Sequence, residues 1–152
     1  MTAHHYAVST TWTGNLGSGT SGYRDYSRDV TVTAEGRPDL LGSADKAFRG
    51  DPERWNPEDL LVASLAQCHL LSFLHIAVNH GVVVTAYRDD ASGTMEQRGI
   101  GGRFTEVVLR PQVELADPEH EPLLPQLHEE AHEACFVASS VAFPVRVEPV
   151  TS

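Results

Sequence analysis

The stretch that decides the fold covers residues 56–81, NPEDLLVASLAQCHLLSFLHIAVNHG. Asn56 can cap a helix, Pro57 suits a first helical turn, and the two acidic residues that follow favour the positive end of the helix dipole. Gly81 is a common residue type directly after a helix end. Apolar positions go nearly all the way round between these ends. The stretch therefore predicts a long central helix that is buried on most of its sides.

The segments on either side of this helix have the pattern of strands. They are rich in β-branched residues and are bounded by glycine, proline and aspartate. A second, polar helix is expected after Asp117 and Pro118, and Pro144 makes the last strand an edge strand or a strand start. The expected strands cover residues 6–13, 23–36, 40–41, 82–97, 102–116 and 140–150, and the second helix covers 119–135. This order predicts one α+β domain over residues 1–152, with antiparallel sheets around the long helix.

The composition limits the function classes. The chain has 152 residues, of which 41% are hydrophobic, and a formal net charge of -10. Such an acidic balance argues against a nucleic acid or an anionic membrane as the partner. The apolar run over 60–78 approaches the length of a membrane span, but Gln67, His69 and other polar residues interrupt it, so a buried helix is favoured. The start of the sequence lacks the basic and apolar segments of a leader peptide, and a cytoplasmic location is expected.

The two cysteines, Cys68 and Cys135, leave several interpretations open. Cys68 lies in the middle of the predicted helix, where it could be a buried filler, a metal ligand or a nucleophile. A free thiol is mostly protonated at neutral pH, so a nucleophile here needs a neighbouring cation. The candidate cations all precede the helix; they are Arg24, Arg28, Lys46, Arg49 and Arg54. Cys135 could form a disulfide with an oxidised Cys68, or could itself be a filler.

A metal site is a competing hypothesis. His128, His132 and Cys135 stand at positions i, i+4 and i+7 of the predicted second helix and would share one of its faces. Imidazole and thiolate are ordinary zinc ligands. The alternative is a solvated histidine-rich face, because acidic residues surround these positions.

Two motifs resemble the OsmC/Ohr family of cysteine-dependent hydroperoxide reductases. The first is Asn56-Pro57-Glu58, followed by an apolar helix with Cys68 ten residues after the glutamate. The second is AHEACFVASSVAFPV over residues 131–145, in which Cys135 precedes the final strand. The resemblance covers nearly the whole chain. One departure is His69, which stands where family members often carry an aromatic residue.

The resemblance implies a role for each site residue. Cys68 would be the nucleophile that attacks the peroxide, Cys135 the cysteine that resolves it, and Glu58 the carboxylate that holds an activating arginine. Ala47 occupies the position at which the family pattern places that arginine. Arg49 is therefore the first candidate and Arg28 the second.

The same resemblance implies an intertwined homodimer with its sites at the subunit interface. Glu58 and Cys68 would lie about 15 Å apart along one helix, so a shared site needs a second chain. The expected function is a thiol peroxidase that reduces organic hydroperoxides in oxidative stress defence, with no cofactor and an external dithiol as reductant. Candidate residues for an apolar substrate lining are Leu65, Leu71, Phe73 and Phe136. The alternative function is a small-molecule or metal-binding protein that keeps this fold without peroxidase activity.

Overall fold

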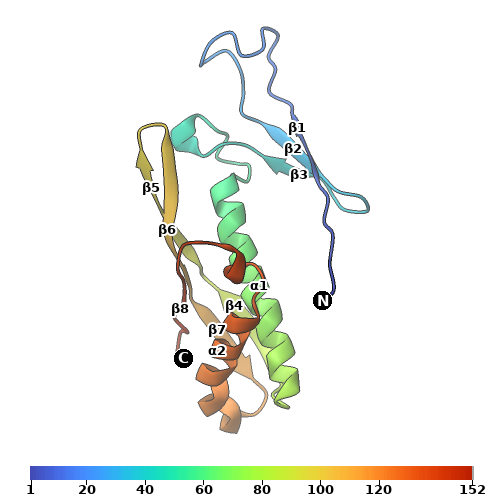
Figure 1. Ribbon diagram of the computed structural model, residues 1–152, viewed down its shortest axis with the longest axis vertical. Coiled ribbons are helices and arrows are strands. Elements are labelled where there is room, and N and C mark those ends of the chain that lie inside the picture. Colours follow the sequence, from blue (N-terminus) through green and yellow to red (C-terminus); the bar gives the residue numbers. More distant parts are fainter. Residues whose placement is uncertain (152) are drawn as a thin grey trace. The chain divides into compact units, whose positions relative to one another are not determined.

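The computed structural model describes residues 1–151 of the chain. These residues form two compact units, Met1–Leu60 and Leu61–Ser152, and each unit has strands of its own (Figure 1). The predicted α+β class with antiparallel sheets and a long helix is confirmed. The single-domain organisation over the whole chain stays a prediction.

The N-terminal unit contains a three-stranded antiparallel sheet in the order β1-β2-β3. Its strands are β1 (Ser9–Trp12), β2 (Val30–Thr33) and β3 (Leu40–Gly42), all within the expected segments or one residue beyond. A short 3₁₀ helix, η1 (Lys46–Phe48), follows and is capped by the side chain of Asp45. β1 and β2 are shorter than expected, and the glycine- and serine-rich connection between them takes up residues 13–29.

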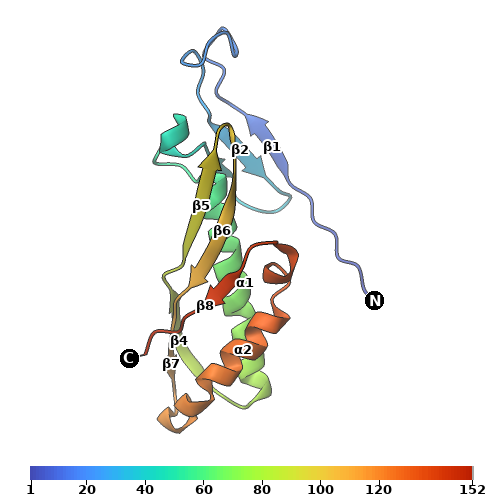
Figure 2. The same ribbon diagram turned by 60° about the vertical axis from the view of Figure 1, so that its left-hand side comes forward.

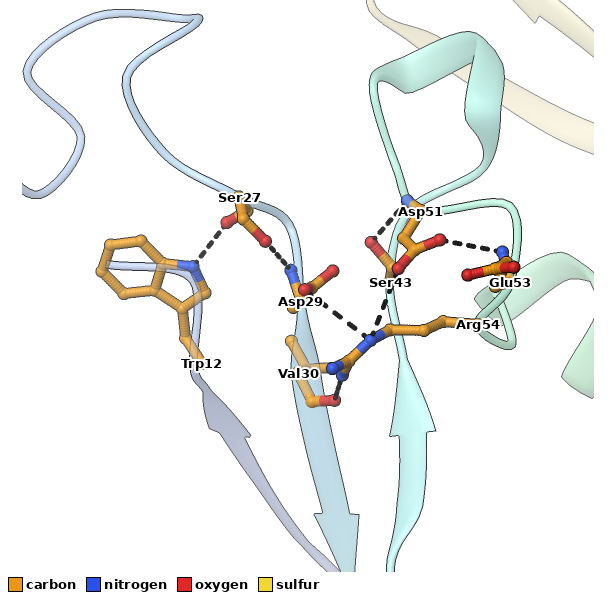
Figure 3. A network of polar contacts seen from close by, with 8 residues as sticks. All are labelled: Trp12, Ser27, Asp29, Val30, Ser43, Asp51, Glu53 and Arg54. Atoms are coloured by element: carbon orange, nitrogen blue, oxygen red, sulfur yellow. Dashed lines mark hydrogen bonds and ion pairs between the residues drawn. The ribbon is translucent and has the colours of Figure 1, made fainter. Parts of the chain in front are cut away.

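A polar network links β2 to the segment that leads into the long helix (Figure 3). The Arg54 Nε lies 3.6 Å from a carboxylate oxygen of Asp29 and 3.8 Å from one of Asp51. The backbone N–H of Asp51 donates to the Oγ of Ser43, which is buried. Arg54, one of the candidate cations for the thiol, is thus occupied by two carboxylates inside the N-terminal unit.

Helix α1 (Pro57–Asn79) confirms the predicted bounds almost to the residue. The Oδ1 of Asn56 accepts a hydrogen bond from the backbone N–H of Asp59 at 2.8 Å, which satisfies a donor of the first turn. Gly81 ends the helix with a φ of 68°, a left-handed conformation that glycine adopts without strain. By length and composition alone, α1 would be long and apolar enough to cross a membrane, a property that core helices share.

The expectation that α1 is buried on most sides is wrong for the isolated chain. Its buried residues form a single stripe at four-residue spacing, namely Leu65, His69, Phe73 and Ala77. Other apolar side chains of α1 are exposed, among them Leu71 at 55% and Val78 at 73%. The structure contains only enough packing partners to cover one face of the helix.

The two long strands expected after α1 are four shorter ones. They are β4 (Val84–Asp89), β5 (Ser92–Arg98), β6 (Gly101–Leu109) and β7 (Pro111–Leu115). β4 pairs with β7, and β5 pairs with β6, both antiparallel. The hairpin is divided where the Asp89 Oδ1 accepts a hydrogen bond from the backbone N–H of Arg110 at 2.7 Å. At this point the Asp89 side chain replaces a backbone hydrogen bond between the strands.

The C-terminal segment contains a composite helix and a last short strand. The expected helix over 119–135 is a 3₁₀ helix, η2 (Pro118–Leu123), followed by α2 (Leu124–Ala134). A short turn, η3 (Ala138–Ser140), leads to β8 (Val145–Val147), which begins directly after Pro144 at the edge of the β5-β6-β8 sheet. β8 pairs with β6 in the parallel direction, whereas the other strand pairs are antiparallel.

In the C-terminal unit, α2 packs against the second half of α1 (Figures 1 and 2). The contact is built from Phe73 and Ala77 of α1 with Leu127 and Ala131 of α2, all at most 1% exposed. A second core cluster, centred on Leu65, joins the first half of α1 to β6. The two helices that carry the cysteines are therefore neighbours with a common core.

Candidate active site

The structure brings the two cysteines together. Cys68 lies half-buried in the middle of α1, and Cys135 follows the last residue of α2 and is 1% exposed. Both are free thiols. The pKa of Cys135 is raised to about 11, chiefly by burial and in addition by the nearby thiol of Cys68. At neutral pH, Cys135 therefore keeps its proton while Cys68 is the more accessible of the two sulfurs.

The backbone around Cys135 holds its sulfur in place. Cys135 has φ -75° and ψ 109°, so the chain leaves the helical path directly after this residue. The backbone N–H of Ala138 donates to the Sγ at 3.4 Å, and the Oγ of Ser139 donates to the Cys135 carbonyl at 3.0 Å. The turn η3 thus fixes the second thiol against α1.

A buried histidine pair joins the two helices near the thiols in sequence. The Nε2 of His69, which directly follows Cys68, is 3.1 Å from the Nδ1 of His128 on α2. The rings are nearly parallel, with an interplanar angle of 10° and centroids 5.4 Å apart, and Phe73 packs against His128. The two histidines are 1% and 4% exposed. The pKa of each is lowered to about 4, chiefly by burial, and the neighbouring His128 and His132 contribute to the lowering for His69.

This arrangement gives no support to the metal hypothesis. The Nδ1 of His128 is engaged with His69. Among residues 1–151, no group of three or more histidine, cysteine, aspartate or glutamate side chains is placed to hold a metal ion.

The two candidate arginines belong to the N-terminal unit. The guanidinium of Arg28 donates to the carbonyl oxygens of Tyr26 and Tyr23 at 2.8 and 2.7 Å, and lies 3.9 Å from the centre of the Tyr26 ring. Arg28 therefore holds the loop between β1 and β2. Arg49 has a φ of 64°, and none of the ion pairs among the described residues includes its guanidinium.

Glu58, the candidate carboxylate, lies in the first turn of α1, ten residues before Cys68. Its Oε2 is buried and has no hydrogen-bond partner among residues 1–151. A buried carboxylate oxygen without a donor is costly and is expected to have a partner in the functional state.

Comparison with protein families decides the kinship of the chain. The family model described as OsmC-like protein matches residues 50–150, a segment that includes α1 and both cysteines. The chain belongs to the OsmC family. No curated protein matches the sequence closely enough to count as a relative.

Solved structures give this OsmC chain close likenesses. An OsmC-like protein of unknown function from Vibrio cholerae is 32% identical, with a TM-score of 0.87 over 97% of this chain and 100% of that one. An organic hydroperoxide resistance protein OsmC from Legionella pneumophila is 17% identical, with a TM-score of 0.69 over 98% of this chain and 97% of that one. An organic hydroperoxide resistance protein from Elizabethkingia anophelis is 18% identical, with a TM-score of 0.70 over 99% and 100%.

The OsmC chain also has a cavity of about 680 Å³ in its C-terminal unit. His128 and His132 line it, together with apolar side chains of α2 and β8, and neither cysteine does. Of the four apolar residues expected to line the thiol site, Leu65 and Phe73 are fully buried in the two cores, so that expectation is wrong for them. Leu71 and Phe136 are exposed and stay candidates.

The burial of His69 could have been predicted from its position in the sequence. His69 lies on the same stripe of α1 as Leu65 and Phe73, four residues from each, which is typical of a buried position. Nothing in the sequence identified His128 as its partner, because that contact joins residues 59 positions apart.

Proposed function

We propose that this OsmC-family protein is a cytoplasmic thiol peroxidase that reduces organic hydroperoxides in oxidative stress defence. The observation that carries the proposal is the proximity of two free thiols, Cys68 in α1 and Cys135 directly after α2, on two packed helices. The names of the Legionella and Elizabethkingia structures support the same substrate class. No cofactor is needed for this chemistry, and an external dithiol serves as reductant.

The proposed reaction balances with two thiols and one peroxide. The thiolate of Cys68 attacks one oxygen of the O–O bond, and the other oxygen leaves with the organic group and takes up a proton to give the alcohol. Cys68 is then a sulfenic acid. Cys135 condenses with it, so that the S–S bond forms, the S–O bond breaks and water leaves. The external dithiol, oxidised to its own disulfide, restores both thiols.

The direct test is to count thiols and measure intact mass before and after one equivalent of cumene hydroperoxide is added to reduced protein. The proposal expects the loss of both thiols within seconds and a mass decrease of about two hydrogens. Unchanged thiols on that timescale would support the second candidate function, a small-molecule binding protein without peroxidase activity. The cavity of about 680 Å³, which contains no cysteine in its lining, is the observation that favours this alternative.

We propose Arg49 as the cation that stabilises the Cys68 thiolate, with Glu58 as its carboxylate partner. Arg49 carries a strained backbone, as functional residues often do, and its guanidinium has no ion-pair partner among residues 1–151. The buried Oε2 of Glu58 is the matching acceptor. Arg28 is the weaker candidate, because it is occupied by Tyr23 and Tyr26.

Replacement of the two arginines separates these candidates. We expect Arg49→Ala to lower kcat/KM for cumene hydroperoxide by on the order of 100-fold, because the thiolate loses its charge-assisted partner. Arg49→Lys should restore only part of the loss, since an ammonium lacks the planar fork of donors. Arg28→Ala should change kcat/KM by less than about threefold once the fraction of folded protein is taken into account. The reverse order of effects would assign the role to Arg28.

We propose that two chains form the functional unit. The outer face of α1 exposes Leu71, Leu74 and Val78, and Val83 beyond the helix end is 60% exposed. Leu71, Leu74 and Val78 share one face of α1, and a patch of this kind on a soluble protein usually marks an interface. A second copy would bury the part of α1 that the isolated chain leaves open.

Light scattering at micromolar concentration tests the oligomeric state. We expect a mass of twice the 16.6 kDa of one chain. Val78→Glu should weaken the dimer, because it places a charge in the apolar interface. Glu96→Gln, on the exposed strand β5, serves as the control and should leave the mass unchanged. A folded monomer of the natural sequence at this concentration would contradict the proposal.

A further inference from the structure

The His69–His128 pair is unusual because it is a polar contact inside an otherwise apolar helix interface. Phe73 and Ala77 of α1 and Leu127 and Ala131 of α2 make up the surrounding core. A buried polar pair contributes little net stability compared with two apolar side chains of similar size. Such a pair does fix the relative position of the two helices. A hydrogen bond is lost beyond about 3.5 Å, whereas apolar contacts are kept when the helices slide slightly past each other.

The position of the pair connects it to both thiols. His69 directly follows Cys68 on α1, and His128 precedes Cys135 by seven residues on α2. Seven residues are two helical turns, or about 10 Å along the helix axis. The bond between the imidazoles at 3.1 Å therefore joins the two elements from which the sulfurs project. A shift of α2 along α1 would break this bond and separate the thiols in the same movement.

Disulfide formation has narrow geometric limits. The Cα atoms must lie about 4.4–6.8 Å apart and the C–S–S–C dihedral near 90°. We propose that His69 and His128 are positioning residues that hold α1 and α2 in the register required for the Cys68–Cys135 disulfide. The inference rests on the proposed peroxidase function for its oxidant, an organic hydroperoxide, but concerns the second step, in which Cys135 displaces water from the sulfenic acid.

The protonation state of the pair follows from its surroundings. The Nδ1 of His69 is buried without a partner among residues 1–151. An unpaired acceptor is tolerated there more readily than an unpaired N–H donor. The Nε2 of His69 therefore carries the proton and donates to the Nδ1 of His128, and both rings are neutral. His132 on α2 and Tyr87 on β4, which packs on Phe73, are the nearby titratable groups.

Rapid mixing of reduced protein with one equivalent of cumene hydroperoxide separates the two steps. Peroxide loss reports sulfenic acid formation, and loss of the second thiol reports disulfide closure. For His69→Leu and His128→Leu we expect the rate of sulfenic acid formation to stay within about twofold of its value in the natural protein. Closure should slow at least about tenfold, because a misplacement of roughly 1 Å can slow a reaction by up to about 100-fold. The sulfenic acid should then accumulate and be trapped by dimedone.

Three further variants distinguish positioning from general damage. The double variant should close no more slowly than either single variant, since both remove the same bond. His128→Asn, whose side chain places a polar atom close to the position of Nδ1, should recover most of the closure rate. His80→Leu removes another contact with α2, the exposed 2.9 Å pair between Glu130 and the residue directly after α1, and should leave closure unchanged. Closure at the natural rate in both leucine variants would overturn the inference.

A second oxidant makes this test independent of the peroxidase proposal. Diamide is a two-electron thiol oxidant that adds to one thiol and is displaced by the other as the disulfide forms. If the natural protein consumes no hydroperoxide, the peroxidase proposal fails, and the ratio of diamide-driven closure rates still tests the histidine pair. A tenfold slower closure in folded leucine variants supports positioning with either oxidant. Equal rates with diamide contradict it.

Discussion

Cys68→Ser is expected to abolish hydroperoxide consumption, with a loss in kcat/KM on the order of 1,000-fold or more. A serine hydroxyl is not ionised at neutral pH and cannot replace a thiolate as nucleophile toward an O–O bond. The neighbouring thiol cannot take over, because Cys135 is 1% exposed and burial raises its pKa to about 11. Steady-state assays with cumene hydroperoxide and an excess of dithiothreitol measure the effect.

Cys135→Ser is the matched control for this prediction. It should leave the first turnover intact, stop the formation of the intramolecular disulfide and allow a sulfenic acid on Cys68 to accumulate. The two serine variants differ only in which of the paired sulfurs is removed, so loss of activity in one and a single turnover in the other assigns the roles. Peroxide consumption that survives Cys68→Ser would contradict the proposed mechanism.

The parts of the fold that depend on local chemistry could be predicted from the sequence. Helix α1 was predicted almost to the residue, because Asn56, Pro57 and Gly81 determine its ends through contacts within a few positions. The division of the hairpin could not be predicted, since it depends on the Asp89 side chain bonding to Arg110, 21 residues away. The parallel pairing of β8 with β6 is equally a product of tertiary packing.

The candidate site, too, could be predicted only in part. The resemblance to a family pointed to Cys68 and Cys135, and the structure places the two thiols near each other. Their chemical roles, and those of Glu58 and Arg49, stay predictions. The expectation that α1 would be buried on most sides came from the distribution of apolar residues around the helix. That distribution shows which faces are apolar, but not which chain covers each of them.

The largest expected effect of pH on stability arises from the histidine pair. In the unfolded chain, histidine takes up a proton near pH 6.5, whereas in the folded chain the pKa of His69 and that of His128 are lowered to about 4. Between these values the unfolded chain binds more protons than the folded one. The free energy of unfolding should therefore fall as the pH falls from about 6.5, and level off near pH 4. The stabilisation by the neutral pair is fully present above pH 6.5.

Urea unfolding at a series of pH values between 7.5 and 4 measures this linkage. Near pH 5 the slope should approach two protons per chain, or about 2.7 kcal/mol per pH unit, on top of the contribution of the carboxylates. The double variant His69→Leu/His128→Leu removes both groups and should show a correspondingly shallower dependence, while His5→Leu, which removes an exposed histidine near the N-terminus, should follow the natural protein. Because the carboxylates are common to all three proteins, the difference between their curves isolates the pair. Parallel curves for the natural protein and the double variant would show that these imidazoles are already protonated, and so not buried as neutral partners, in the folded state.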